Sequence, residues 1–206
     1  KSARTISAIA KDAEIACILT KEENLDVIRL HCKELFENGS IWLLSKNDFQ
    51  KENISRFTLP KLTSQSIAYL QYTSGSTSSS KGVKISHANL MNSLIATGNI
   101  WEYSNKSITL TWAPHAHVYG LICGILVPLY HGTTGILISP AEFIKNPIFW
   151  LRLIDKYKVT HSGCPNFGYD VCVQGIKAKD CESLNLSSWK VAVNGGEAVQ
   201  HDTLKQ

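Results

Sequence analysis

The sequence predicts an α/β fold in which mostly parallel sheets are covered by helices on both faces. Strand-like and helix-like segments alternate along the chain, and several strand-like segments are short, continuous apolar runs of the buried type. Hydrophobic residues make up 44% of the 206 residues and charged residues 18%, a composition typical of globular proteins.

The first part of the chain predicts one β-α-β unit. Its expected elements are a helix over 2–12, a strand over 15–19, a helix over 25–36 and a strand over 41–44. Asn38 and Gly39 end the second helix, because both residue types favour helix termination. Residues 47–65 are polar and contain Pro60, so we expect a connecting loop there.

The second part continues the alternation. Residues 67–72 and 83–85 are strand-like and flank a Ser-rich loop, and Ser86 is placed to cap the helix that follows. The remaining expected strands are 108–112, 135–138 and 189–194, and the remaining helices are 121–129, 148–157 and 167–176.

Charge and apolar runs exclude two classes of partner. The net charge is +4, and the 21 Lys and Arg residues form no block of the kind that binds nucleic acid or a membrane surface. The longest apolar stretch, 120–130, is interrupted by Pro128 and is too short to span a bilayer, so we expect a buried helix and no membrane span.

The cysteines predict reduced core thiols. None of the six forms a C-x-x-C pair, and most have apolar neighbours. With no signal peptide, this indicates a cytoplasmic protein. The chain has no initiator Met, and residues 202–206 stop inside a helix-like segment without a capping signal, so we expect a piece of a longer polypeptide.

The Ser-rich loop, residues 73–82, has the composition of a phosphate-binding loop. Gly75 and Gly82 permit close backbone approach, serines and threonines supply hydroxyl donors, and Lys81 supplies positive charge. A flexible Ser-rich linker has a similar composition. The loop lies directly between two strand-like runs, whereas linkers usually separate domains, and this favours phosphate binding.

The loop does not fit the G-x-x-x-x-G-K-[ST] pattern of nucleoside triphosphatases. Counting from Gly75, Ser80 stands where that pattern requires Gly, and Gly82 where it requires Ser or Thr. The segment after the loop is strand-like instead of helical.

Residues 72–77, Y-T-S-G-S-T, followed by K-G-V at 81–83, resemble the signature loop of the acyl-adenylate-forming enzymes. Residues 112–121, W-A-P-H-A-H-V-Y-G-L, resemble that family's second core motif, with His117 at its histidine and Val118 in place of its usual Asp. Ser80 replaces a common proline.

Two further segments resemble fatty acyl-AMP ligases within that family. Residues 162–170 are similar to their G-P-N-F-x-Y-D segment, and residues 186–189 and 194–199 to their L-S-S-W and N-G-x-E-x-V elements. Four motifs thus occur in the family's order.

The resemblance implies that ATP, with Mg²⁺, and a fatty acid meet on this chain, giving an acyl-adenylate and pyrophosphate. His117 would flank the acyl carboxylate as the catalytic residue, and no residue would act as a covalent nucleophile. The implied nucleotide-binding residues are Thr73, Ser74, Gly75, Ser76, Thr77, Lys81, Gly82, Gly195, Gly196 and Glu197. The implied substrate-binding residues are His117, Gly163, Pro165, Asn166, Phe167 and Tyr169.

Structural roles remain open for several of these residues. Glu197 could equally be an N-terminal residue of a helix, where the helix dipole favours its charge, and Trp150 is better explained by core packing than by an acyl tunnel. His115 and His117 would share one face of a strand, but no Cys or carboxylate nearby completes a ligand set, so we expect no metal site.

The resemblance also implies a domain organisation. The chain would be a fragment of the family's N-terminal domain, with a βα subregion at 1–65 that carries no diagnostic motif and an ATP- and acyl-binding core at 66–206. The C-terminal catalytic-lysine domain would lie beyond Gln206, so we expect the isolated fragment to be inactive.

The acyl acceptor would be an acyl carrier protein or a polyketide or peptide synthase domain. The alternatives are an acyl-CoA synthetase and a non-catalytic nucleotide-binding module; Val118 and Ser80 favour the module.

Overall fold

The computed structural model describes residues 3–37, 39–51, 58–73 and 81–205. The chain forms two compact units, Lys1–Leu90 and Met91–Gln206. The boundary between the two units falls inside helix α3 (His87–Ile100). Each unit has its own buried core.

The first unit begins with the expected β-α-β arrangement. Its elements are α1 (Ala3–Asp12), β1 (Cys17–Leu19), η1 (Glu22–Asn24), α2 (Leu25–His31), η2 (Lys33–Leu35), β2 (Trp42–Leu44) and η3 (Lys46–Lys51). Strands β1 and β2 pair in parallel, and Ala10, Cys32 and Leu35 form the core beside them. The helix expected over 25–36 ends earlier, at His31, and the 3₁₀ turn η2 follows it.

An antiparallel hairpin, β3 (Ile67–Thr73) and β4 (Lys81–Ser86), follows in the first unit. Its two strands were expected, and they pair antiparallel whereas the other strands of the described residues pair in parallel. Ser86 caps α3 as predicted: its hydroxyl accepts the N–H of Asn89 at 3.1 Å, while Asn89 Oδ1 accepts the N–H of Ser86 at 3.1 Å. This reciprocal pair satisfies two donors at the helix N-terminus.

The second unit contains a parallel sheet in the order β6-β5-β7-β8. Its strands are β5 (Ile108–Thr111), β6 (Thr134–Leu137), β7 (His161–Cys164) and β8 (Val191–Asn194). Its helices after α3 are α4 (Val118–Leu121), η5 (Ile122–Leu126), α5 (Val127–Tyr130), α6 (Pro140–Lys145), α7 (Ile148–Tyr157), α8 (Asn166–Gly175), α9 (Ala178–Cys181) and α10 (His201–Lys205).

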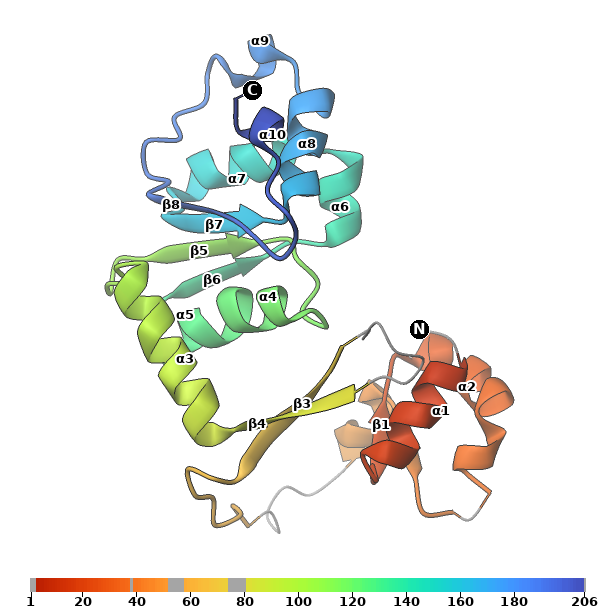
Figure 1. Ribbon diagram of the computed structural model, residues 1–206. Coiled ribbons are helices and arrows are strands. Elements are labelled where there is room, and N and C mark those ends of the chain that lie inside the picture. Colours follow the sequence, from red (N-terminus) through yellow and green to blue (C-terminus); the bar gives the residue numbers. More distant parts are fainter. Residues whose placement is uncertain (1–2, 38, 52–57, 74–80, 206) are drawn as a thin grey trace. The chain divides into compact units, whose positions relative to one another are not determined.

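Helices cover both faces of this sheet, with α6, α7 and α8 on one side and α4 and α5 on the other (Figure 1). The alternation of side chains along β5 explains both layers. Leu110 packs with Phe143 and Trp150 in the core on the α6–α7 side. Thr111 points to the other side, where a Cβ on Gly124 would lie 2.3 Å from its methyl group. The predicted fold class is confirmed.

The core of the second unit contains a cluster of aromatic rings. Trp112 lies against Phe143 with ring centroids 3.9 Å apart, and Trp150 meets both rings edge-on. Trp150 is fully buried, as the core interpretation required, and its indole N–H donates to Ser162 Oγ at 2.9 Å. This hydrogen bond satisfies the indole N–H of Trp150 and the hydroxyl of Ser162, so that both side chains can be buried.

The apolar stretch 120–130 is helical throughout but not a uniform α-helix. Its central part, η5, is a π-helix that precedes α5 and Pro128. Proline has no N–H to give to the carbonyl four residues earlier and its ring crowds that carbonyl, which accounts for the local widening. Across the described ranges, no helix is both long and apolar enough to cross a membrane.

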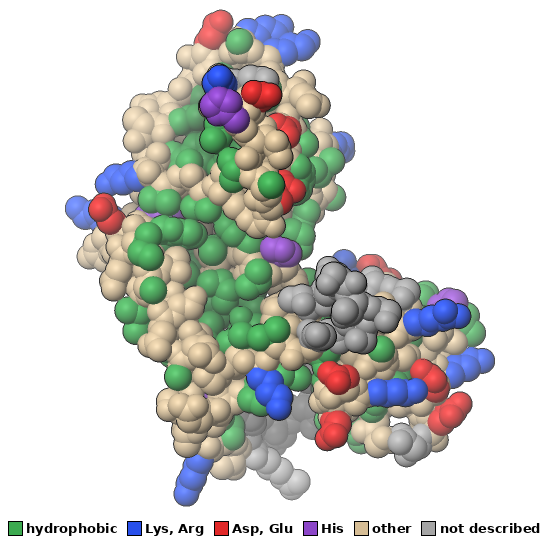
Figure 2. All heavy atoms as spheres, viewed as in Figure 1, with side chains coloured by type: hydrophobic (Ala, Val, Ile, Leu, Met, Phe, Trp, Pro, Cys, Tyr) green, Lys and Arg blue, Asp and Glu red, His purple; other side chains and the backbone are tan. Residues whose placement is uncertain are grey.

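All six cysteines are free. Burial raises the pKa of Cys123 to about 11 and that of Cys172 to about 12, so both thiols are held in the protonated form. Cys17 is exposed and departs from the expected core placement. Basic and acidic side chains are interspersed on the face shown in Figure 2, in keeping with the absence of a basic block in the sequence.

Gly120 should be irreplaceable for packing. A Cβ at this position would lie 2.3 Å from the carbonyl oxygen of Pro114 and 2.6 Å from that of Ala113, both backbone atoms that cannot rotate away. We expect Gly120→Ala to lower the free energy of unfolding by about 1–3 kcal/mol, despite the better helix propensity of alanine. Urea denaturation followed by tryptophan fluorescence measures this.

Gly195→Ala is the matched control, because a Cβ there meets nothing within 4 Å. It should change stability by less than about 0.5 kcal/mol. Equal stability of the Gly120 variant and the wild type would contradict the packing argument.

Candidate functional site

The carboxyl ends of β5, β7 and β8 lie at one edge of the parallel sheet, where ligand sites of such sheets occur. Three segments leave this edge: 112–117 after β5, 165–170 after β7 and 194–200 after β8. They contain every predicted site residue of the second unit except Gly163. The edge therefore brings together residues that are up to 80 positions apart in the chain.

His117 is exposed and caps helix α4. Its Nδ1 accepts the N–H of Tyr119 at 3.2 Å, and this leaves Nε2 to carry the ring proton in the neutral imidazole. The histidine is thus oriented by main chain, without the Asp that Val118 replaces. It can present an N–H donor to an anionic group.

The predicted strand face shared by His115 and His117 is wrong. Strand β5 ends at Thr111, and both histidines lie in the turn before α4. No group of three or more His, Cys, Asp or Glu side chains suited to a metal occurs in the described part of the chain.

Gly163 lies inside β7 and is buried. A Cβ there would lie 2.2 Å from the carbonyl oxygen of Val193 in the neighbouring strand, so close strand packing requires glycine at this position. This geometry accounts for the residue without any contact to a ligand.

Helix α8 begins at the same edge, and Pro165 immediately precedes it. Phe167 is 43% exposed and its ring meets Trp112 edge-on at 5.6 Å. Tyr169 is half-buried, which raises its pKa, and its hydroxyl donates to the carbonyl of Val193 at 2.9 Å. Phe167 therefore offers the more accessible apolar surface.

Asn166, the first residue of α8, is 3% exposed. Its Oδ1 accepts from Asn194 Nδ2 at 3.2 Å and from the N–H of Gln200 at 2.9 Å. Its Nδ2 donates to Thr203 Oγ1 at 3.0 Å and to Asp170 Oδ2 at 3.3 Å. Both lone pairs and both amide protons are in use, so a ligand would have to displace one of these bonds.

The glycine turn after β8 contains Gly195, Gly196 and Glu197. Gly196 has a φ of 89°, a conformation that favours glycine. Glu197 Oε1 accepts the N–H of Phe167 at 2.7 Å, so its carboxylate lies at the N-terminus of α8. Glu197 is therefore not an N-terminal residue of its own helix, because it lies in the turn after β8, and its carboxylate instead meets the N-terminus of a helix distant in sequence.

The Ser-rich loop belongs to the first unit. Ser74, Gly75, Ser76 and Thr77 lie outside the described residues. The strands on both sides are described, and Gly82 pairs opposite Tyr72, whose ring covers it: a Cβ on Gly82 would lie 2.8 Å from Tyr72 Cζ. The hydroxyl of Tyr72 donates to the carboxylate of Asp12, which raises the pKa of the tyrosine.

Two contributors to the site were missed by the sequence analysis. Asp170 and Thr203 are joined by a hydrogen bond of 2.6 Å from the threonine hydroxyl, and this bond ties α10 to α8. Asp170 falls inside a motif and could have been singled out there. Thr203 carries no local signal, because its partner is 33 positions away.

A family model described as AMP-binding enzyme matches residues 2–206. The medium-chain-fatty-acid–acyl-carrier-protein ligase JamA of Moorena producens is 38% identical over 97% of this chain, which spans 34% of that relative. The corresponding ligase TtuA of Teredinibacter turnerae is 38% identical over 78% of this chain and 25% of its own length.

A solved fatty acyl-adenylate ligase from L. pneumophila, in complex with acyl adenylate and pyrophosphate, matches with a TM-score of 0.84 and 35% identity. The match covers 98% of this chain and 34% of that one. The chain therefore spans between a quarter and about a third of the length of these three proteins.

Glu197 should contribute to stability through its helix contact. Glu197→Ala leaves the N–H of Phe167 without its acceptor, and we expect the free energy of unfolding to fall by about 0.5–2 kcal/mol. Glu197→Gln keeps an acceptor oxygen and should lose less. Glu182→Ala, at an exposed carboxylate of the same unit, is the control. Equal stabilities of the Glu197→Ala and Glu182→Ala variants in urea denaturation would refute the capping role.

Proposed function

The chain belongs to the AMP-binding enzyme family, and we propose that it forms part of a longer ligase that uses ATP to activate a fatty acid as an acyl-adenylate. The observation that carries this proposal is the match of nearly the whole chain to a fatty acyl-adenylate ligase at 35% identity. The geometry of the sheet edge is compatible with it, because an exposed imidazole donor and a glycine turn occur there together.

The reaction joins two anions, which sets the task of the protein. A carboxylate oxygen attacks the α-phosphorus, a new P–O bond forms to give the mixed anhydride, and the bond from the α-phosphorus to the bridging oxygen breaks, so that this oxygen leaves with pyrophosphate. Two unit negative charges 4 Å apart repel each other by about 4 kcal/mol at an effective dielectric constant of about 20. Donors and cations are therefore needed to bring the partners together.

We assign binding of the phosphates and binding of the adenine to different segments of the chain. Thr73, Ser74, Ser76, Thr77 and Lys81 would hold the β- and γ-phosphates, as hydroxyl and ammonium donors do in other phosphate sites. The turn at 195–197 would border the adenine, with its two glycines leaving room for the base.

His117 would donate its Nε2–H to the acyl carboxylate. The main-chain hydrogen bond at Nδ1 fixes the ring and this tautomer, so the donor is oriented before the substrate arrives.

Mg²⁺ would accompany ATP as its counter-ion. This cation is usually held by phosphate oxygens, water and one or two carboxylates, so the phosphates of ATP would supply part of its ligands.

The acceptor of the acyl group is proposed to be the thiol of an acyl carrier protein. The two relatives described above are named for transfer to such a carrier. An acyl-CoA synthetase is the alternative, and it differs only in the thiol that attacks the adenylate. Six free cysteines agree with a reducing compartment, for which we propose the cytoplasm.

Fatty-acid-dependent exchange of labelled pyrophosphate into ATP tests the proposal in the full-length gene product. We expect Lys81→Ala to raise KM for ATP about tenfold, because a phosphate contact is lost. Lys84→Ala is the matched control, an exposed lysine three positions along the same strand, and should leave KM unchanged. Exchange that does not depend on fatty acid, or equal effects of both substitutions, would contradict the proposal. The 206-residue chain alone should show no exchange.

His117→Asn separates the proposed catalytic role from helix capping. Asparagine is a good N-cap residue and can still accept the N–H of Tyr119, so the melting temperature should change little. We expect kcat/KM for the fatty acid to fall about 100-fold, since the imidazole donor is lost. His115→Asn, at the neighbouring exposed histidine, should retain activity. A fully active His117→Asn enzyme would remove the residue from the mechanism.

A further inference from the structure

The loop 194–200 runs from the last residue of β8 to the residue before α10 and has little main-chain hydrogen bonding of its own. Among the described residues, the loop makes one main-chain to main-chain hydrogen bond outside helices and strands, from the N–H of Gly195 to the carbonyl of Cys164 at 3.4 Å. The N–H of Gln200 instead binds the side chain of Asn166. Most of its residues are exposed. Its conformation must therefore be set by side-chain contacts from a neighbouring element.

A single oxygen joins the two ends of this loop. Asn166 Oδ1 accepts from the side chain of Asn194, where the loop starts, and from the main chain of Gln200, where it ends. Between these ends, Glu197 binds the N–H of Phe167. The first two residues of α8 thus hold the loop at its base and near its middle.

The other half of the Asn166 amide is anchored in turn. Its Nδ2 donates to Asp170, one turn further along α8, and to Thr203 in α10. Thr203 donates to the second oxygen of Asp170 at 2.6 Å. This closed set of hydrogen bonds fixes the rotamer of Asn166, and a buried amide with all four positions filled is costly to rearrange.

We propose that Asn166 is a positioning residue for nucleotide binding: it holds the loop 194–200 in the conformation that receives the adenine, and it does not itself contact the substrate. The inference rests on the proposed function, since it assigns to Asn166 the geometry of a turn proposed to border ATP. The proposed positioning role differs from the direct substrate contact that the family resemblance implied for Asn166. Asp170 and Thr203 act through Asn166.

The first test measures steady-state kinetics of pyrophosphate exchange into ATP by the full-length gene product. Asn166→Ala removes the oxygen that closes the loop, and we expect KM for ATP to rise about tenfold or more, as displacements of a binding group by about 1 Å commonly produce. KM for the fatty acid should stay within about twofold of the wild-type value. A rise in the fatty-acid KM with an unchanged ATP KM would overturn the proposal in favour of direct substrate contact.

A conservative pair provides the rescue. Asn166→Asp keeps an oxygen for Asn194 and Gln200 but sets a second carboxylate against Asp170. Combining it with Asp170→Asn exchanges the amide and the carboxylate and restores a hydrogen bond between the two positions. The double variant should recover most of the ATP affinity lost in Asn166→Asp alone. No recovery would contradict the network.

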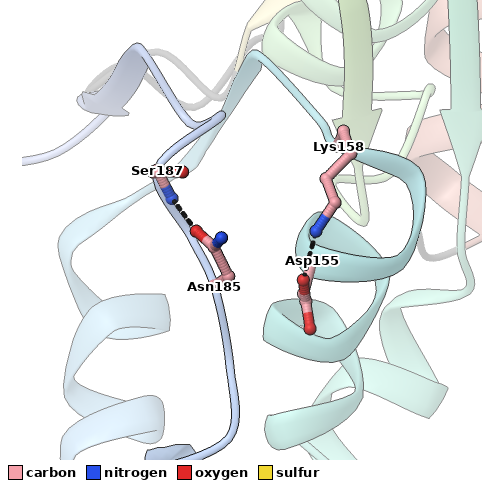
Figure 3. A network of polar contacts seen from close by, with 4 residues as sticks. All are labelled: Asp155, Lys158, Asn185 and Ser187. Carbon is pink, nitrogen blue, oxygen red and sulfur yellow. Dashed lines mark hydrogen bonds and ion pairs between the residues drawn. The ribbon is translucent and has the colours of Figure 1, made fainter.

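Asn185→Ala is the matched control. Asn185 is an exposed asparagine of the same unit whose Oδ1 accepts the N–H of Ser187 at 3.1 Å, next to the Asp155–Lys158 ion pair at the end of α7 (Figure 3). It also shapes a loop, but on another part of the unit. Its removal should leave both KM values unchanged, and an equal effect on ATP would reduce the role of Asn166 to general stability.

Hydrogen exchange separates this inference from the proposed function. The N–H of Gln200 loses its acceptor in Asn166→Ala, so peptides covering 194–201 should exchange faster than in the wild type and in Asn185→Ala. If the wild-type enzyme shows no fatty-acid-dependent exchange of pyrophosphate into ATP, the proposed function fails. If the N–H of Gln200 is also equally protected from hydrogen exchange in the wild type and in Asn166→Ala, the positioning of the loop by Asn166 is rejected as well. Active wild-type enzyme with unaltered ATP KM and unaltered protection rejects the inference alone.

Discussion

The second unit depends on the placement of β7 between β5 and β8. This strand is buried along its whole length, although its residues are His161, Ser162, Gly163 and Cys164. Each polar group finds a partner: the Ser162 hydroxyl donates to the carbonyl of Leu110 at 2.7 Å, and His161 Nε2 donates to the carbonyl of Trp101 at 2.7 Å. Burial lowers the pKa of His161 and keeps the imidazole neutral. Because β7 aligns its neighbours, the three site segments leave the sheet at one edge.

The same strand shows where sequence reasoning stops. Apolar periodicity predicted β5, β6 and β8 to within a few residues, but β7 has no apolar run and was not predicted. Its burial depends on hydrogen bonds to Leu110, Trp150 and Trp101, which are distant in sequence. The short helix α6 was missed for a related reason. Phe143 is its one fully buried residue, and a single apolar position does not make a helical repeat that the sequence analysis could recognise. Local pattern therefore identified elements with an apolar face and missed those stabilised by tertiary contacts.

Residues of the same sequence motif differ in burial and in the contacts they make. In the W-x-P-x-x-H-x-x-G segment, Gly120 is required by the nearby carbonyls of Ala113 and Pro114, whereas His117 is exposed and presents a donor. In the G-P-N-F segment, Gly163 and Asn166 are buried and engaged with protein atoms, whereas Phe167 has accessible surface. Recurrence in a motif does not distinguish a residue that binds a ligand from one that shapes the backbone around it. Burial and completed hydrogen bonding show which of these residues already have protein partners, as Asn166 does, and which remain accessible, as His117 does.

Strand pairing also bears on the two interpretations of the Ser-rich loop. A linker joins parts that move apart, so its two ends have no fixed separation. Here the residues that flank the loop, Thr73 and Lys81, stand directly opposite each other in an antiparallel ladder, where Cα atoms lie about 4.5–5.5 Å apart. The ends are thus held together by a hairpin that Tyr72 and Gly82 tighten further through their close contact. The paired strands give these two ends a fixed separation, and the strand register therefore argues against the linker interpretation.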